Sequence, residues 1–315
     1  MLDIERADPI FIQGIMPRGG TNFLWDLLLL HPDCSRGRPP VNEDLFLDHS
    51  DYLVAFTRAV RASWDARWGT FGADLPDQLC AGIGEGLVSF LWTDRDRRLV
   101  TKSPSVGHLD RFFLFYPWAR LLILVRDGRS VVQSCIDTFG WEFDRACRAW
   151  AHAADMISQF RHTEASRADR WRMVRYEDLV DDSEGQLRSV FEFVHLDATR
   201  YDFEAARNLP VRGSSAFGRR AGAVHWEPVA RDASFAPKDR WRTWSAEQQK
   251  RFDWLAGEQL AALGYDGRPA RRQLRSSARH LLLDGVWTAR QAARLARSHL
   301  GSASRPLRRR LGLVE

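Results

Sequence analysis

A glycine-rich turn near the start of the chain has the residue types and spacing that could hold a phosphate group. Gly14 and Gly19 enclose four residues in the spacing GxxxxG, between an apolar run over 9–15 and a helix-like segment over 23–31. Glycines let backbone N–H groups wrap an anion, and a helix start adds donors and a positive dipole end. Nucleoside triphosphatases carry lysine where this chain has Gly20. The turn therefore predicts a site for one phosphate with a small attached anion rather than for ATP.

A second set of anion-binding side chains follows the most apolar run in the chain, residues 120–125. A continuous run of this kind is typical of a strand buried in a parallel sheet. Arg126 comes directly after it, and Ser134 lies one helical turn beyond Ser130. Because α/β sheets bind ligands outside the carboxyl ends of their strands, this arginine and hydroxyl suit a terminal phosphate. The alternative is a surface ion pair between Arg126 and Asp127.

The remaining patterns predict the elements that position these residues. Further strands are expected over 99–101 and 171–176, and helices over 130–138, 145–162 and 183–195. Strands that alternate with helices indicate an α/β fold, with a P-loop-like central parallel sheet flanked by helices. No internal repeat or low-complexity linker interrupts residues 1–266, which we interpret as one domain, followed by a basic helical C-terminal extension over 267–315.

The two phosphate motifs together resemble those of the PAPS-dependent sulfotransferase family, where PAPS is 3′-phosphoadenosine 5′-phosphosulfate. The segment 17–24 is similar to the PRSGTTxL signature that holds the 5′-phosphosulfate, with Gly19 in place of serine and Asn22 in place of threonine. An arginine followed eight residues later by serine is similar to the 3′-phosphate motif, and VRDGR has the form found in tyrosylprotein sulfotransferases. The resemblance implies nucleotide-binding roles for Arg18, Gly19, Gly20, Thr21, Asn22, Phe23, Arg126 and Ser134.

Weaker matches extend the resemblance over residues 9–266. The motifs are also similar to those of carbohydrate and bacterial sulfotransferases. Thr101-Lys102-Ser103-Pro104 is similar to the TKxP segment, whose lysine contacts the transferring group, and Leu263-Gly264-Tyr265 to the LGY that ends the domain. The YEDL segment at 176–179 and the late loop that closes over the nucleotide imply further binding roles for Tyr176, Ser214, Ser215, Lys238 and Arg240.

Transfer to an alcohol needs a proton acceptor close to the acceptor hydroxyl. The segment 39–46 resembles the part of many sulfotransferases whose glutamate is the base, so Glu43 is the expected base. Asp44 and His49 are the two competitors, and solvated loop acids are the structural alternative. Lys102 is expected to neutralise charge on the sulfuryl oxygens, and Arg18 to assist at the donor.

These residues predict a PAPS-dependent O-sulfotransferase that forms 3′-phosphoadenosine 5′-phosphate and needs no metal. The expected acceptor is a hydroxyl of a small molecule, a carbohydrate or a glycolipid, and no nucleic acid is expected as a partner. Two alternatives stay open: a P-loop small-molecule kinase, which the missing lysine disfavours, and a non-catalytic membrane-surface binding protein.

The charge of the chain is divided unequally. Residues 267–315 contain twelve arginines and two acids, a net charge of +10, whereas the whole chain has only +5. A basic amphipathic helix expected over 279–300 could lie on anionic lipid, pack on the acidic body or remain mobile. The start, Met1-Leu2-Asp3-Ile4-Glu5, lacks the pattern of a secretory signal, so we expect a cytoplasmic protein with an optional contact at the inner membrane face.

Composition and the remaining motifs indicate little further chemistry. With 44% hydrophobic and 28% charged residues and no apolar run of about 18, the sequence excludes channels and wholesale disorder. The four cysteines form no CxxC pair and the histidines no HExxH motif, so buried thiols and no zinc site are expected. Gly82-Ile83-Gly84-Glu85-Gly86 resembles a dinucleotide fingerprint only loosely and is interpreted as a flexible loop.

Overall fold

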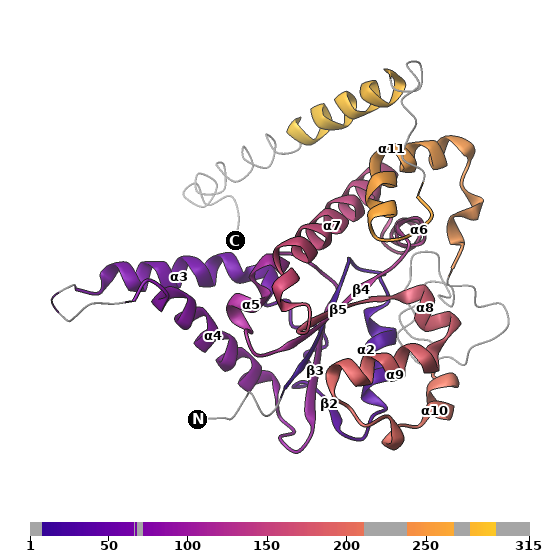
Figure 1. Cartoon of the computed structure of the whole chain (residues 1–315). Helices are drawn as coiled ribbons and strands as arrows, with labels where there is room; N and C mark the ends of the chain where they lie inside the picture. Colours follow the sequence, from indigo (N-terminus) through magenta and orange to yellow (C-terminus); the bar gives the residue numbers. More distant parts are fainter. Residues whose placement is uncertain (1–7, 66, 68–71, 211–237, 268–277, 294–315) are drawn as a thin grey trace, which may run out of the picture.

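The fold is built on one parallel sheet of five strands in the order β2-β3-β1-β4-β5 (Figure 1). The structure is a computed structural model that describes residues 8–65, 67, 72–210, 238–267 and 278–293. The strands are β1 (Ile10–Gly14), β2 (Cys34–Arg36), β3 (Arg98–Ser103), β4 (Arg120–Val125) and β5 (Trp171–Arg175). The central strand β1 therefore ends at the predicted phosphate loop, between β3 and β4.

Helices cover both faces of the sheet. They are α2 (Thr21–Leu29), α3 (Ser50–Ser63), α4 (Leu75–Leu91), α5 (Phe112–Phe115), α6 (Gly128–Phe139), α7 (Phe143–Thr163), α8 (Tyr176–Asp181), α9 (Ser183–Val194), α10 (Phe203–Arg207) and α11 (Ala246–Ala262). Alternate residues of a strand point to opposite faces. On β4, Leu121 and Ile123 join the core beneath α4–α7 and α11, whereas Leu122 and Leu124 join the core beneath α2 and α9.

The expected α/β class and most of the expected elements are confirmed. The apolar run 120–125 is β4, and the shorter run at 99–101 belongs to the longer strand β3, which also contains Lys102. The four cysteines are buried and free, as expected. The expectation of a loop at Gly82–Gly86 is wrong, because these residues lie inside α4. Gly84 faces α5 so closely that an added Cβ would lie 1.9 Å from the Phe115 carbonyl oxygen, so the glycine serves helix packing.

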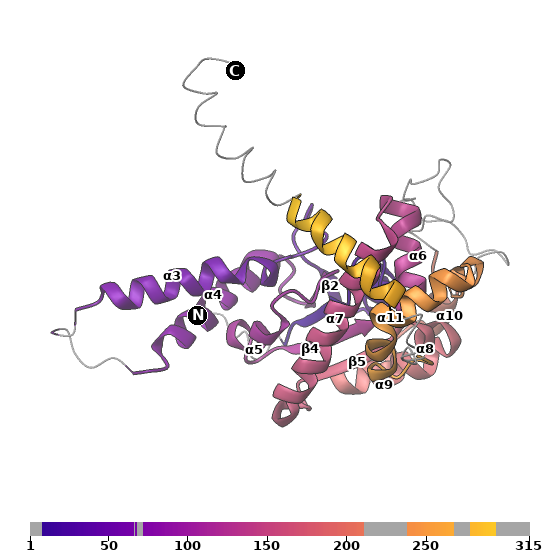
Figure 2. The same ribbon diagram turned by 90° about the horizontal axis from the view of Figure 1, so that it is seen from above.

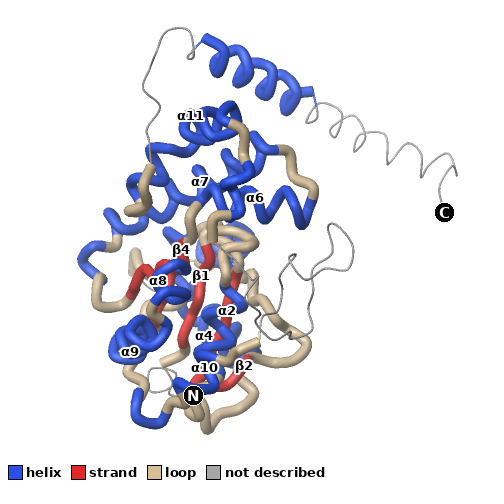
Figure 3. The backbone as a smooth tube through the Cα atoms, turned by 90° about the vertical axis from the view of Figure 1, so that its right-hand side faces the viewer, coloured by secondary structure: helices blue, strands red, loops and turns tan. Residues whose placement is uncertain are grey.

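Two parts extend away from the sheet. The helices α3 and α4 form an arm on one side, which both the front view and the view from above show (Figure 1, Figure 2). Residues 278–293 form a further helix beyond α11, at one end of the molecule (Figure 3). The expected helix over 279–300 is therefore present over its described part, and residues 294–300 lie outside the described residues.

Candidate active site

The loop after β1 has the backbone conformation of an anion-binding turn. Arg18 has φ +72° and Gly20 has φ +100°, so residues in the left-handed region alternate along the loop. The Gly19 N–H donates to the Met16 carbonyl at 3.0 Å, which closes the turn. The helix α2 then begins at Thr21 without a side-chain cap and without an acid in its first turn. The positive end of the α2 dipole is therefore directed at the loop, where it would favour a bound anion.

Close packing fixes this loop against the next functional segment. A Cβ at Gly20 would lie 2.4 Å from Cδ2 of Tyr176, the first residue of α8. A Cβ at Gly14 would lie 2.3 Å from the Thr21 methyl group. The glycines therefore permit contact with the Tyr176 ring and with the helix start, besides giving conformational freedom.

Three arginines meet at this loop. Arg126 lies at the carboxyl end of β4 and donates to the Arg18 carbonyl at 2.9 Å, with its guanidinium 4.3 Å from the Tyr176 ring centre. Arg18 Nε donates to Ser134 Oγ at 3.0 Å. Burial, followed by repulsion from Arg240 and Arg126, lowers the pKa of Arg18 to about 10. Burial and Arg126 likewise lower the pKa of Arg240. Cations that are desolvated and repel one another are suited to bind a multiply charged anion.

One strand away, Lys102 on β3 forms an ion pair with Glu43. The Nζ–Oε1 distance is 3.1 Å; the lysine side chain is 1% exposed and the glutamate side chain 35%. Lys102 Nζ also lies 5.5 Å from the Trp25 ring centre on α2. The acid is thus accessible to a second substrate, whereas the lysine is held inside the protein. The pair resembles a base beside a fixed positive charge.

Asp44 faces away from this pair. Its carboxylate accepts hydrogen bonds from Thr101 Oγ1 at 2.7 Å and from the Phe46 N–H at 3.4 Å. Thr101 and Lys102 are consecutive strand residues, so their side chains point to opposite faces of the sheet. Burial raises the pKa of Asp44. The carboxyl group therefore anchors the loop that carries Glu43 to β3, and its position disfavours Asp44 as the base.

We expect the wild-type chain to lose stability relative to the Asp44→Asn variant as the pH rises. The folded chain holds the Asp44 proton more tightly than the unfolded chain, whose pKa is about 3.9. The stability contribution is complete below the unfolded pKa and is lost as the pH rises through the folded pKa, by about 1.4 kcal/mol for each unit of pKa separation. Urea unfolding of both proteins at about pH 4 and about pH 8 measures the change. A wild-type advantage that grows with pH would instead show that Lys102 holds this carboxylate ionised.

The other candidate residues are only partly brought together. His49 lies exposed at the end of a 3-10 turn, with its ring 6.4 Å from that of Tyr52. Phe23 packs edge-to-face with the Tyr176 ring beside the loop, with the two ring centres 5.9 Å apart. Lys238 pairs with Asp181 at the end of α8. Ser214 and Ser215 lie outside the described residues.

Two positioning contacts escape sequence reasoning. Glu177 accepts from the Asp127 N–H at 3.0 Å and from the Tyr265 hydroxyl at 2.9 Å, so it links the YEDL segment to the turn after β4 and to the LGY segment. Trp25, an apolar residue of α2, forms one wall around Lys102. The YEDL and LGY segments are both recognisable in the sequence. The two contacts of Glu177, however, join residues 50 and 88 positions apart.

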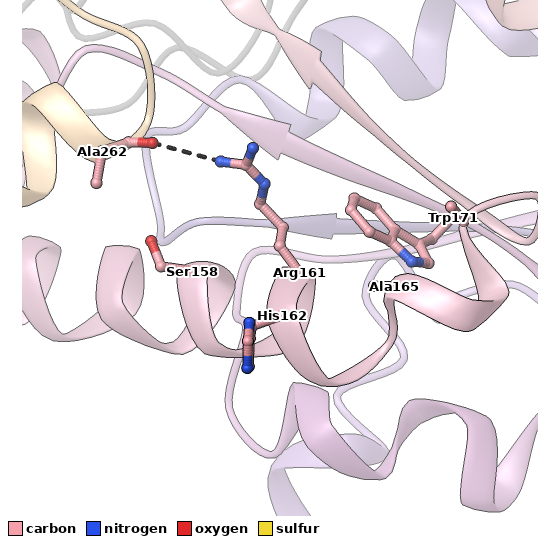
Figure 4. Close-up of a pocket in the computed structure, with 7 residues that line it drawn as sticks. Ser158, Arg161, His162, Ala165, Trp171 and Ala262 are labelled. Carbon is pink, nitrogen blue, oxygen red and sulfur yellow. Dashed lines mark hydrogen bonds between the residues drawn. The ribbon is translucent and has the colours of Figure 1, made fainter.

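A pocket of about 510 Å³ lies away from these groups (Figure 4). It is lined by the end of α7, the start of β5 and Ala262 of α11, and Arg161 there donates to the Ala262 carbonyl at 3.3 Å. Trp171 is the first residue of β5, so the pocket lies toward the amino end of that strand. The candidate site instead lies at the carboxyl ends, where α/β sheets bind ligands.

The described residues show neither a metal site nor a membrane-spanning helix. Among the residues that the structure describes, no group of three or more His, Cys, Asp or Glu side chains is arranged to hold a metal ion. Within the same ranges, every helix is too short or too polar to cross a membrane.

The parallel sheet, the glycine-rich loop after its central strand and the arginines around that loop define a nucleotide-binding, P-loop-like α/β protein. Residues 9–200, more than half of the chain, match the sequence model of the sulfotransferase family. The chain therefore belongs to the sulfotransferase family.

Named relatives agree with this assignment. The chain is 27% identical over 204 residues to protein-tyrosine sulfotransferase A of Caenorhabditis elegans, which covers 61% of this chain and 51% of the relative. It is 26% identical over 203 residues to a Drosophila melanogaster protein-tyrosine sulfotransferase, covering 60% and 38%. The match thus spans about half or less of each relative. The sulfotransferase domain of the Synechococcus PCC 7002 olefin synthase is similar with a TM-score of 0.48 and 19% identity, covering 82% of this chain and 95% of that domain.

Proposed function

We propose that this enzyme transfers a sulfuryl group from PAPS to the hydroxyl of a small-molecule, carbohydrate or glycolipid acceptor. The observation that carries the proposal is the meeting of Arg18, Arg126 and Arg240 at an uncapped helix start, with the Glu43–Lys102 pair one strand away. A nucleotide with phosphate at both the 3′ and 5′ positions has enough negative charge for three arginines. The groups present therefore fit the donor that the family motifs imply.

The roles of the residues follow from their exposure and charge. Glu43 is open to solvent and accepts the proton of the acceptor hydroxyl while that oxygen forms its bond to sulfur. The bond from sulfur to the 5′-phosphate oxygen breaks, and its electron pair leaves with 3′-phosphoadenosine 5′-phosphate. Lys102 is fixed by Glu43 and Trp25 and stabilises negative charge on the sulfuryl and bridging oxygens. The arginines and the loop hold the phosphates, and the half-buried Phe23 offers a ring surface for the adenine. The buried Tyr176 ring packs against Arg126 and Gly20 and positions them.

A phenolic hydroxyl of a protein is a second candidate acceptor, because both named relatives are protein-tyrosine sulfotransferases. Their match covers about half of their length or less, so the acceptor does not transfer with the family. The two acceptor classes are distinguished by incubating the enzyme with labelled PAPS and either tyrosine peptides or carbohydrate and lipid extracts.

We expect the 3′-phosphate to raise nucleotide affinity by about ten- to hundredfold, because charge-assisted hydrogen bonds contribute about 1.5–3 kcal/mol each. Calorimetry compares 3′-phosphoadenosine 5′-phosphate with adenosine 5′-monophosphate. The Arg126→Ala variant should lose most of the difference. The matched control is Arg145→Ala, which removes an exposed arginine that stacks on Trp141 and should leave the difference unchanged.

Equal affinities for the two nucleotides would contradict the donor assignment. Tighter binding of ATP in the presence of Mg²⁺ would favour the small-molecule kinase instead. Binding of the bisphosphate without transfer to any acceptor would favour the non-catalytic binding protein.

A further inference from the structure

The helix formed by residues 278–293 packs on the body through polar side chains. Asp284 accepts from Arg251 at 2.7 Å and from Trp254 Nε1 at 3.0 Å, and it also pairs with Arg148. The His280 ring stacks on Trp254 with its centre 5.1 Å away. These contacts join the helix to α7 and α11, above which it lies (Figure 1, Figure 3).

The opposite side of the same helix is apolar and faces solvent. Leu281, Leu282 and Val286 are 60%, 69% and 42% exposed, and Ala289 and Ala293 are exposed as well. At 100° per residue, Leu282, Val286, Ala289 and Ala293 lie across the helix from His280, Asp284 and Trp287, and Leu281 lies at the edge between the two sides. The helix is therefore inverted relative to an ordinary surface helix: the buried His280 and the half-buried Asp284 face the body, and an apolar stripe faces solvent.

The ionic contacts hold the helix in this orientation. Arg251 also pairs with Asp144 of α7, and the Arg148 guanidinium lies 4.5 Å from the Trp287 ring centre. Turning the apolar side inward would break the Asp284 pairs with Arg251 and Arg148 and the hydrogen bond from Trp254. It would also place the Asp284 carboxylate on the solvent side, away from these partners. An exposed apolar stripe that cannot turn inward marks an interaction surface rather than a misplaced core helix.

Charge identifies the occupant that fits this surface. Residues 278–315 carry eight arginines and two acids, a net charge of +6, and Arg290 is exposed beside the apolar side. Pairing of two copies through this helix would bring the exposed Arg279 and Arg290 of both copies close together, which is unfavourable. An anionic lipid surface offers apolar chains for the leucines and negative headgroups for the arginines.

We propose that the apolar side of helix 278–293 docks on anionic lipid and holds the enzyme at a membrane surface. This contact goes beyond the proposed sulfuryl transfer, since the groups that make it belong neither to the loop nor to the Glu43–Lys102 pair. It places the enzyme where an amphiphilic acceptor would be concentrated.

The test is sedimentation of the full chain with vesicles of phosphatidylcholine alone and with about 30% phosphatidylglycerol. We expect binding to the anionic vesicles, at least about tenfold weaker binding to the neutral ones, and weakening in about 0.5 M salt. The double variant Leu282→Asp/Val286→Asp should lose at least about tenfold in affinity for the anionic vesicles. Since both residues are exposed, its melting temperature and nucleotide affinity should match those of the wild type.

The matched control is the double variant Phe56→Asp/Phe90→Asp, which places the same two charges at residues of α3 and α4 that are 60% and 51% exposed and should leave vesicle binding unchanged. Absence of binding to anionic vesicles overturns the proposal, as does equal binding by the double variant. Light scattering that finds a dimer, dissociated by the double variant, would assign the surface to a second copy instead. None of these measurements uses PAPS or an acceptor, so their failure is separate from failure of the proposed function.

Discussion

Replacing Glu43 with glutamine is expected to lower the rate of sulfuryl transfer by about 10²–10⁴-fold, the usual contribution of a positioned base. The amide keeps the shape of the side chain and can still accept from Lys102, which lies 3.1 Å from it. It cannot take the proton of the acceptor hydroxyl. Affinity for 3′-phosphoadenosine 5′-phosphate should stay within about twofold, because the nucleotide is held by the arginines at the loop. Single-turnover kinetics and calorimetry measure the two quantities separately.

The neighbouring acid and histidine provide the controls. Asp44→Asn should retain turnover, since this carboxyl group is buried and accepts a hydrogen bond from Thr101. His49→Gln should retain it as well, because the His49 ring lies beside Tyr52 and Lys102 pairs with Glu43 instead. Near-normal turnover in Glu43→Gln, together with a large loss in one of the other two variants, would move the base to that residue.

Replacing Lys102 with methionine is expected to slow transfer by about 10²–10³-fold, comparable to removing one preorganised donor from an oxyanion site. The lysine side chain is 1% exposed, so its charge acts in a desolvated environment where electrostatic effects are large. Methionine retains most of the volume beside Trp25, and the fold should therefore be preserved, as circular dichroism can verify. Affinity for the bisphosphate product should fall by less than the rate, because that product keeps the bridging oxygen but lacks the sulfuryl group.

Lys250→Met is the matched control, since it removes the same charge from an exposed position of α11. It should leave the transfer rate unaltered. A double variant of Glu43 and Lys102 should lose less than the product of the two single effects, because the two side chains are in contact. A loss of rate in the double variant equal to the product of the two single losses would show that Glu43 and Lys102 act independently. A rate unaffected by Lys102→Met would remove the lysine from the mechanism.

Local pattern predicted much of the sheet, because a strand buried on both faces leaves a continuous apolar run. The run 120–125 shows this directly, and the loop between β1 and α2 was recognisable from its glycines. The edge strand β2 has only three residues and no such run. Helix α4 was missed because its glycines resemble a loop, while Gly84 in fact allows close packing on α5.

The site was predictable as a set of residue types but not as a geometry. Glu43 and Lys102 were each singled out, yet nothing local relates two residues 59 positions apart. The separation of Asp44 from this pair depends on which face of β3 each side chain occupies. The inverted orientation of helix 278–293 depends on Arg148 and Arg251, which belong to α7 and α11. Tertiary contacts of this kind have no signature in sequence periodicity.

The contact between Gly20 and Tyr176 restricts the evolutionary routes open to this loop. A triphosphate-binding loop would need lysine at position 20, but a side chain there would collide with the Tyr176 ring at 2.4 Å and would have to adopt a φ of +100°. A point mutation toward ATP chemistry would therefore damage the loop before the new charge could be used. Acquiring that lysine requires a smaller residue at 176 and a changed backbone at the same time. The preference against ATP as a donor thus depends on the packing of Gly20 against Tyr176 as well as on the absence of a lysine at position 20.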